Sequence, residues 1–119
     1  MSPGTDGSLT RTPQNVLVLK GQDANLLCST DGTSRSGQNP IEWKYDGNII
    51  SYIPCISSRN SGFVAFPPNS STDCNLRALA SNELGISGVY RCEETGARSS
   101  DKQAVATVVV LGELSSNFY

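Results

Sequence analysis

Four cysteines are the residues of this chain best suited to chemistry: Cys28, Cys55, Cys74 and Cys92. Thiolates can bind zinc, but structural zinc sites use closely spaced ligand pairs, and no two of these cysteines form a C-x-x-C motif. The chain also contains no histidine. An even number of isolated cysteines is typical of disulfide bonds, which form in oxidising compartments. We therefore interpret all four as disulfide partners, with an all-cysteine zinc site as the alternative.

No group of residues predicts catalysis. Without histidine the chain cannot form a Ser-His-Asp or Cys-His arrangement. Glu93 and Glu94 are adjacent on a predicted strand, so they point to opposite faces and cannot act as a carboxylate pair. The segments GTDG and STDG lack the spacing of a phosphate loop or an EF-hand. We expect a protein that is not an enzyme and that needs no metal or cofactor, with calcium on scattered loop aspartates as the alternative.

The length and composition fit one small globular domain. The chain has 119 residues, 37% of them hydrophobic and 17% charged, with a formal net charge of −2. This charge gives no reason to expect nucleic acid or an anionic membrane as a partner. No apolar run approaches the ~20 residues that cross a bilayer, and the opening segment MSPGTDGSL has no signal-peptide core. We interpret the chain as a piece of a cell-surface or secreted protein, with no membrane insertion of its own.

About nine short strands and no amphipathic helix are predicted. The clearest strand is IEWKYD, where apolar and charged residues alternate as on a half-buried strand; Asp46-Gly47 then begins a hairpin turn. Many short strands with frequent turns predict an all-β sandwich. We expect a lead-in over 1–12, a domain over 13–112 and a C-terminal stub over 113–119. The predicted strands are 9–12, 15–20, 24–30, 41–46, 49–53, 63–66, 73–79, 89–94 and 103–111.

Cys28, Trp43 and the segment VYRC, which ends at Cys92, follow one another in the order and spacing of an immunoglobulin domain. The chain resembles that family over about 13–112. The resemblance implies a Greek-key sandwich in which a Cys28–Cys92 disulfide joins the sheets and Trp43 packs on that bond. It also implies that Tyr90 forms the tyrosine corner, with its hydroxyl bonded to the backbone of the preceding turn. Both aromatic residues are then structural.

The subtype of the resemblance is a V-type domain, because the distance from Trp43 to Cys92 leaves room for strand C′ and a short C″. The alternative is the intermediate type, which the short C–C′ hairpin WKYDGNII favours. Two features depart from the family. Ile86 replaces the usual aspartate, so a salt bridge from Arg59, the candidate strand-D arginine, cannot form. Residues 103–112 also lack the Phe-Gly-x-Gly motif of antigen-receptor variable domains, so we do not expect receptor-style heterodimers.

Two further features concern the side of the predicted sandwich. Cys55 follows the predicted strand C′ and Cys74 begins strand E, and the strand order of the resemblance brings them together. We expect a second disulfide between them, with free or intermolecular thiols as the alternative. Asn69 starts the N-glycosylation sequon Asn-Ser-Ser in a predicted loop. If it is glycosylated, this side faces solvent; otherwise it is a plain polar turn.

Function in such a fold lies on surfaces. The resemblance implies an extracellular recognition module of an immune-type receptor or adhesion protein, which binds a protein ligand or a second copy as a weak homodimer. One candidate surface is the outward face of strands G, F, C and C′. The other is the tip formed by the B–C, C′–C″ and F–G loops, where Arg35 and Arg98 lie. With Trp43 and Cys92 inward, alternation places these candidates outward on the face: Glu42, Lys44, Val89, Arg91 and Glu93.

Two other functions are compatible with the sequence. One is a structural spacer in a larger ectodomain. The other is a secreted carbohydrate-binding or chitin-binding domain, which ranks last because Trp43, Tyr45 and Tyr90 are assigned to the core. The facing of the strand 103–111 is undecided, since both of its parities are apolar. If both sides of this strand are buried, the outer side meets another domain or chain.

Overall fold

The computed structural model describes residues 8–31, 39–46, 50–55, 59–60, 62–67, 70–82, 85–94 and 102–112, and strands occupy most of these residues. Eleven strands occur in these ranges, and all nine predicted strands are among them. They are β1 (Leu9–Arg11), β2 (Val16–Leu19), β3 (Ala24–Leu26), β4 (Ser29–Thr30), β5 (Ile41–Asp46), β6 (Ile50–Pro54), β7 (Arg59–Asn60), β8 (Phe63–Phe66), β9 (Asn75–Ala78), β10 (Gly88–Glu94) and β11 (Gln103–Leu111).

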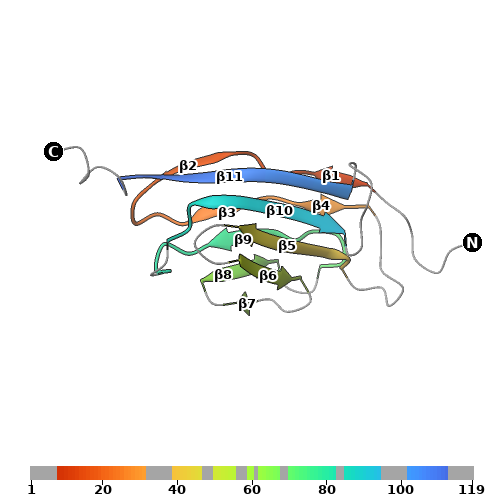
Figure 1. Cartoon of the computed structure of the whole chain (residues 1–119). Coiled ribbons are helices and arrows are strands. Elements are labelled where there is room, and N and C mark those ends of the chain that lie inside the picture. Colours follow the sequence, from red (N-terminus) through yellow and green to blue (C-terminus); the bar gives the residue numbers. More distant parts are fainter. Residues whose placement is uncertain are drawn as a thin grey trace, which may run out of the picture.

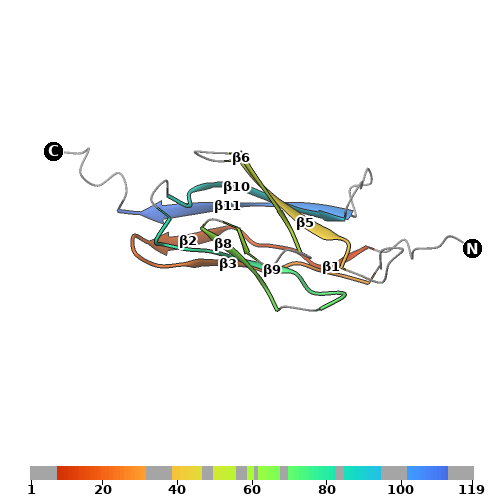
Figure 2. The same ribbon diagram turned by 90° about the horizontal axis from the view of Figure 1, so that it is seen from below.

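Two sheets face each other across the core (Figures 1 and 2). One has the order β2-β11-β10-β5-β6 and the other the order β3-β9-β8-β7, while β1 and β4 pair as a separate ribbon. Neighbouring strands are antiparallel except β11 and β2, which run parallel. The predicted all-β sandwich is confirmed. The predicted strand 24–30 is divided into β3 and β4, because its first half pairs with β9 and its second half with β1.

Alternation along each strand decides which side chains fill the core. On β3 and just beyond it, Ala24, Leu26 and Cys28 are all buried, as their spacing predicts. The facing of β11, which the sequence left undecided, is settled by the structure, since its even-numbered residues from Ala106 to Val110 are buried and its odd-numbered valines are exposed. The largest fully buried side chains are Trp43, Tyr90, Phe63, Leu26, Ile41, Leu76 and Val108.

Two disulfides cross the sandwich, and both predicted pairings are confirmed. Cys28 bonds Cys92 with a Cα–Cα distance of 6.5 Å, and Cys55 bonds Cys74 with a Cα–Cα distance of 6.1 Å. Both distances lie in the ordinary range for disulfides. The first bond links the segment between β3 and β4 to β10, and the second links the end of β6 to the residue before β9. Each therefore ties one sheet to the other.

Removal of the second disulfide with the double substitution Cys55→Ala and Cys74→Ala should lower the free energy of unfolding by about 3 kcal/mol, because the bond closes a loop with a sequence separation of 19. Urea unfolding at neutral pH measures the change. Peptide mapping of the wild-type protein without reduction serves as the control and should yield the Cys28–Cys92 and Cys55–Cys74 peptides. A loss below ~1 kcal/mol would show that this bond does not restrain the unfolded chain.

Candidate functional site

The candidate face is the outer side of the five-stranded sheet, and Trp43 fixes its position from beneath. Trp43 lies opposite Cys92 in the β5–β10 register and is fully buried. Its indole Nε1–H donates a hydrogen bond to the Cys74 carbonyl at 2.9 Å. The Cys74 amide donates in turn to the Cys28 carbonyl at 2.8 Å. Strand β5, which lies between β10 and β6, is therefore connected to a residue of each disulfide.

Two tyrosines fix the opposite end of β5 and β10. The hydroxyl of Tyr90 donates to the Ile86 carbonyl at 2.7 Å, which is the corner hydrogen bond expected from the sequence. Tyr45 lies opposite Tyr90, stacks on it with ring centroids 4.5 Å apart, and donates its own hydroxyl to the Ser87 carbonyl at 2.7 Å. Sequence analysis placed Tyr45 in the core but missed this bond, because alternation predicts the facing of a ring and not the partner of its hydroxyl.

Ile86 belongs to the core and is only 3% exposed. Because an aliphatic side chain carries no charge, Ile86 packs in the core and cannot form an ion pair. This agrees with the predicted loss of the family's salt bridge. The side chain of Arg59, the candidate partner for that bridge, lies outside the described residues. Burial, followed by the neighbouring Tyr45, raises the pKa of the Tyr90 phenol above its usual value.

Asn39 is a structural residue that sequence analysis missed. Its side-chain Nδ2 donates to the carbonyls of Ser70 and Asp73 at 3.1 and 2.8 Å, and its Oδ1 accepts the Ile41 amide at 2.9 Å. These bonds join the start of β5 to the segment before β9. The only signal in the sequence was an Asn-Pro pair before a strand, which indicates a turn but not its long-range partners.

Arg91 stands at the centre of the outer face. It lies opposite Lys44 on β5 and opposite Val105 on β11, and its own side chain is exposed. Val89, two residues earlier on the same face, is 41% exposed, and Val105 is 51% exposed. We call Lys44, Val89, Arg91 and Val105 the recognition patch. The structure thus brings together three of the predicted candidates and adds Val105, whose facing the sequence could not decide.

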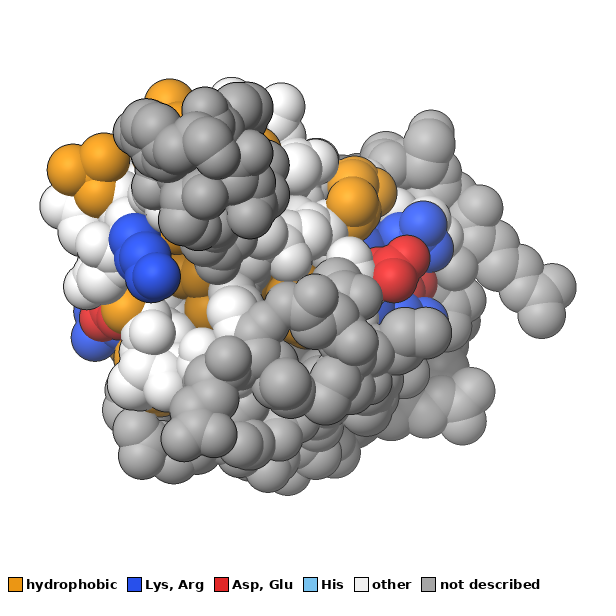
Figure 3. All heavy atoms as spheres, turned by 60° about the vertical axis from the view of Figure 1, so that its left-hand side comes forward, with side chains coloured by type: hydrophobic (Ala, Val, Ile, Leu, Met, Phe, Trp, Pro, Cys, Tyr) orange, Lys and Arg blue, Asp and Glu red, His pale blue; other side chains and the backbone are white. Residues whose placement is uncertain are grey.

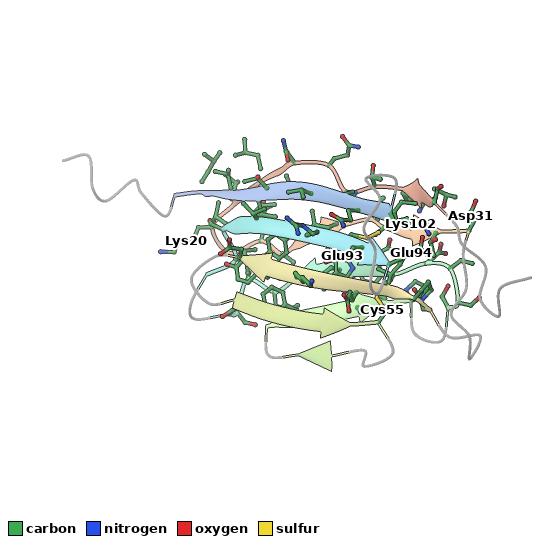
Figure 4. The ribbon with its side chains drawn as sticks, turned by 45° about the vertical axis from the view of Figure 1, so that its right-hand side comes forward. Lys20, Asp31, Cys55, Glu93, Glu94 and Lys102 are labelled. Carbon is green, nitrogen blue, oxygen red and sulfur yellow. A yellow bond between two sulfur atoms is a disulfide. The ribbon has the colours of Figure 1, made fainter. Side chains whose placement is uncertain are left out.

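Glu42 and Glu93 require a correction. Alternation places both on the outer face as predicted, but they are only 6% and 5% exposed, so they have little surface to offer a partner. They lie directly opposite each other in the β5–β10 register, and Gln103 flanks Glu93 on its other side. Each lies on a strand that has a neighbouring strand on both sides within the sheet. Figure 4 shows Glu93 and Glu94 at the end of β10.

Glu93 forms an ion pair with Lys44 within the outer face. The Lys44 Nζ lies 2.9 Å from Glu93 Oε1, while the Lys44 side chain remains 49% exposed. This hydrogen bond and the carboxylate charge raise the pKa of Lys44. Among the described residues, Arg91 has no ion-pair partner. The positive charge of Lys44 is therefore matched within the sheet, whereas that of Arg91 is not.

Exposed aliphatic side chains gather on the same sheet. Among the residues whose burial is described, seven large hydrophobic side chains are exposed; six of them belong to β2, β10 and β11, and the seventh is Leu27. Figure 3 shows hydrophobic side chains at the surface along the upper part of the molecule, where β2 and β11 lie in Figure 1. The six are Leu17, Leu19, Val89, Val105, Val109 and Leu111.

Other predicted features fall outside the described residues, namely the loop residues Arg35 and Arg98 and the sequon residue Asn69. Among the residues that are described, no group of three or more histidine, cysteine, aspartate or glutamate side chains could hold a metal ion. In the same ranges there is no helix long and apolar enough to cross a membrane.

Substitution Tyr90→Phe should lower the free energy of unfolding by about 1 kcal/mol, because it removes the corner hydrogen bond and leaves the Ile86 carbonyl without that donor. Tyr45→Phe should cost a similar amount for the bond to Ser87. Both substitutions keep the stacked rings. Urea unfolding of each single variant provides the measurement, and wild-type stability in both would mean that the hydroxyls do not hold the turn.

The stability of the fold should also fall above pH ~10, where an unperturbed tyrosine ionises. Since the folded state raises the pKa of Tyr90, the folded protein keeps this phenol neutral while the unfolded chain loses its proton. The contribution of Tyr90 is thus complete below pH ~10 and is lost as the pH rises further. Between pH 8 and 11, the free energy of unfolding should fall less with pH for Tyr90→Phe than for the wild type. Identical slopes for the two proteins would contradict a raised pKa of Tyr90 in the folded state.

Comparisons with known proteins relate the chain to others by structure. No protein-family model matches the sequence, and no curated protein matches it. Solved structures do match, among them the first domain of Duf (Kirre), with a TM-score of 0.64, 15% identity and coverage of 89% of this chain and 97% of that one.

Two titin structures are also similar. A chimeric titin Z1Z2 matches with a TM-score of 0.60, 23% identity and coverage of 92% of this chain and 97% of that one. A complex of titin M10 with an obscurin-like 1 Ig domain matches with a TM-score of 0.59, 22% identity and coverage of 91% and 95%. At these identities the likeness concerns the fold alone. Together with the two crossing disulfides, it shows that this chain has an immunoglobulin-like fold.

Proposed function

We propose that this chain is an extracellular recognition module that binds a protein partner through the outer face of its five-stranded sheet. The observation that carries the proposal is the setting of Arg91. Its exposed side chain has no ion-pair partner among the described residues, and it lies next to Val89 and Val105, which are 41% and 51% exposed. An exposed arginine beside apolar side chains is typical of the residues that dominate protein interfaces.

The charges of the recognition patch define what its partner must offer. Lys44 is engaged by Glu93 at 2.9 Å, so its charge is already balanced. The charge of Arg91 is not, and a carboxylate is the group that a guanidinium binds best, through two parallel hydrogen bonds. The two neighbouring valines favour an apolar surface beside that carboxylate. We therefore expect a partner surface with an aspartate or glutamate among aliphatic or aromatic side chains.

The sheet beneath the patch is rigid, which favours binding. Tyr90 and Cys92, the chain neighbours of Arg91, are fully buried, and each is fixed by a hydrogen bond or a disulfide. The Lys44–Glu93 ion pair also restricts a side chain next to Arg91. A rigid surface loses little conformational entropy when a partner binds, so more of the contact energy contributes to affinity.

Two disulfides support an extracellular setting, because such bonds persist in oxidising compartments. The titin M10 complex with an obscurin-like 1 Ig domain is a protein–protein complex formed by a domain of this fold. Carbohydrate binding is less well supported, since none of the aromatic side chains described in the structure is exposed. Roles for Arg35 and Arg98 in binding and glycosylation of Asn69 remain proposals.

For the subtype, the strand arrangement supports the intermediate type over the V-type. Strand β6 is the last strand at its edge of the five-stranded sheet, and β7 pairs with β8 in the other sheet. A V-type domain adds both C′ and C″ to the sheet that holds β10 and β11. Within the described ranges that sheet has a strand in the C′ place, β6, and none beyond it.

The test compares the purified domain with its Arg91→Glu variant on a panel of cell-surface and secreted proteins of the source organism. We expect the wild type to bind a member of the panel and Arg91→Glu to weaken that binding at least ~10-fold, which corresponds to ~1.4 kcal/mol. Arg11→Glu is the matched control, since it makes the same charge change on β1, outside the five-stranded sheet.

Three results would contradict the proposed face. One is equal binding by Arg91→Glu and the wild type, and another is an equal loss in Arg11→Glu. The third is a loss of binding only when Arg35 or Arg98 is changed, which would place recognition at the loop tip instead. Circular dichroism and urea unfolding show whether each variant keeps its fold.

A further inference from the structure

Four aliphatic side chains on β2 and β11 form a second exposed surface, which the recognition patch does not include. Leu17, Leu19, Val109 and Leu111 are 64%, 57%, 47% and 45% exposed, and we call them the aliphatic stripe. In the parallel pairing of the two strands, Leu17 lies opposite Val109 and Leu19 lies opposite Leu111. The residues between them on β2, such as Val18, pack against the core. All four side chains of the stripe therefore point to the outer side.

The aliphatic stripe is unusual for its place in the fold. Strand β2 is an edge strand of the five-stranded sheet. Edge strands of soluble proteins are commonly protected by charged residues, above all lysine, since exposed apolar edges associate with other chains. Here the outward positions of the edge carry Leu17 and Leu19. A contiguous apolar surface of this kind indicates an interaction site.

We propose that the aliphatic stripe is the interface at which two copies of this chain form a homodimer. The two-fold axis of this dimer runs parallel to β2 and β11 and passes between them, over the outer side of the sheet. Such an axis exchanges the two strands. It places Leu17 over Val109 of the second copy and Leu19 over Leu111 of the second copy, because these residues are already in register within one sheet. The stripe is thus complementary to itself, as a two-fold interface requires.

The charges along the two strands agree with this geometry. The next outward pair beside the stripe is Asn15 and Thr107, which are joined by a hydrogen bond from the Thr107 amide to Asn15 Oδ1 at 2.9 Å. On the other side of Leu19, the next outward position of the chain is Gly21, where a side chain would have open space. None of these outward residues is charged, so these positions bring no like charges together across the axis. The formal net charge of −2 adds little repulsion between copies.

The size of the stripe predicts a weak dimer. Four aliphatic side chains from each copy cover less than the ~800 Å² per partner of a stable interface. We expect a dissociation constant between ~1 µM and ~1 mM. Lys44, Val89 and Arg91 lie on β5 and β10, on the far side of β11 from β2, so the dimer leaves these three residues of the recognition patch uncovered. Each dimer would present two copies of them, and the resulting avidity would strengthen binding to a clustered partner.

Sedimentation equilibrium of the purified domain at up to ~1 mM tests the dimer, with the variant Leu17→Lys expected to weaken it at least ~10-fold. Lysine is well tolerated on edge strands, so the fold should survive. The matched control is Leu27→Lys, which makes the same change at a leucine that is also exposed, at 42%, but lies outside the five-stranded sheet. A monomeric wild type, or equal dimerisation by Leu17→Lys, would overturn the proposal.

Cysteine cross-linking tests the axis itself and needs no knowledge of the protein partner. A mixture of Leu17→Cys protein with Val109→Cys protein should form an intermolecular disulfide faster than either variant forms one alone, because the axis places position 17 over position 109. Preferential cross-linking of Leu17→Cys with itself would overturn this axis. Arg91→Glu should dimerise like the wild type, so failure of the dimer and failure of the proposed recognition patch can be told apart.

Discussion

Cys74 connects the two sheets through two bonds and is joined to the neighbouring strand of its own sheet by a third, and the geometry of the outer face depends on it. Its sulfur bonds Cys55, its amide donates to the Cys28 carbonyl, and its carbonyl accepts the indole Nε1–H of Trp43. Trp43 in turn lies opposite Cys92, the partner of Cys28. One residue next to β9 therefore fixes the position of β5, and through β5 that of β10. Movement of the sheets past each other would have to break several of these bonds together.

This fixed interior explains why the outer face can specialise. The side chain period of a strand is two, so a shift of one residue in β10 would bring Arg91 into the core and expose Tyr90. The disulfide of Cys92 and the hydroxyl bond of Tyr90 exclude such a shift. Inward positions are thereby confined to one packing arrangement, while outward positions can change without loss of the fold. Binding properties can then be set by a few outward residues, such as Val89, Arg91 and Val105.

The sequence predicted those parts of the structure that local patterns determine. Alternation over 41–46 predicted the facing of Trp43, and the resemblance to an immunoglobulin domain implied both disulfides and the hydroxyl bond of Tyr90. It did not predict the burial of Glu42 and Glu93, the bonds of Asn39 or the facing of β11. These depend on cross-strand neighbours and long-range partners. For β11 in particular, valines on both parities hide the alternation, and only its pairing with β10 shows which side meets the core.

The two ends of the outer face offer different interactions, one based on charge and the other on apolar contact. Toward β5, charged groups predominate, and one of them, Arg91, has no ion-pair partner among the described residues, so its contribution depends on the chemistry of what it meets. On β2 and the part of β11 that pairs with it, the outward positions carry aliphatic and uncharged polar groups, for which burial is favourable with any apolar surface of fitting shape. A surface of the first kind provides selectivity, because a wrong partner leaves a charge desolvated and unpaired. A surface of the second kind provides association without selectivity. If a second copy of the same face covers it, the surface is no longer open to unselected partners.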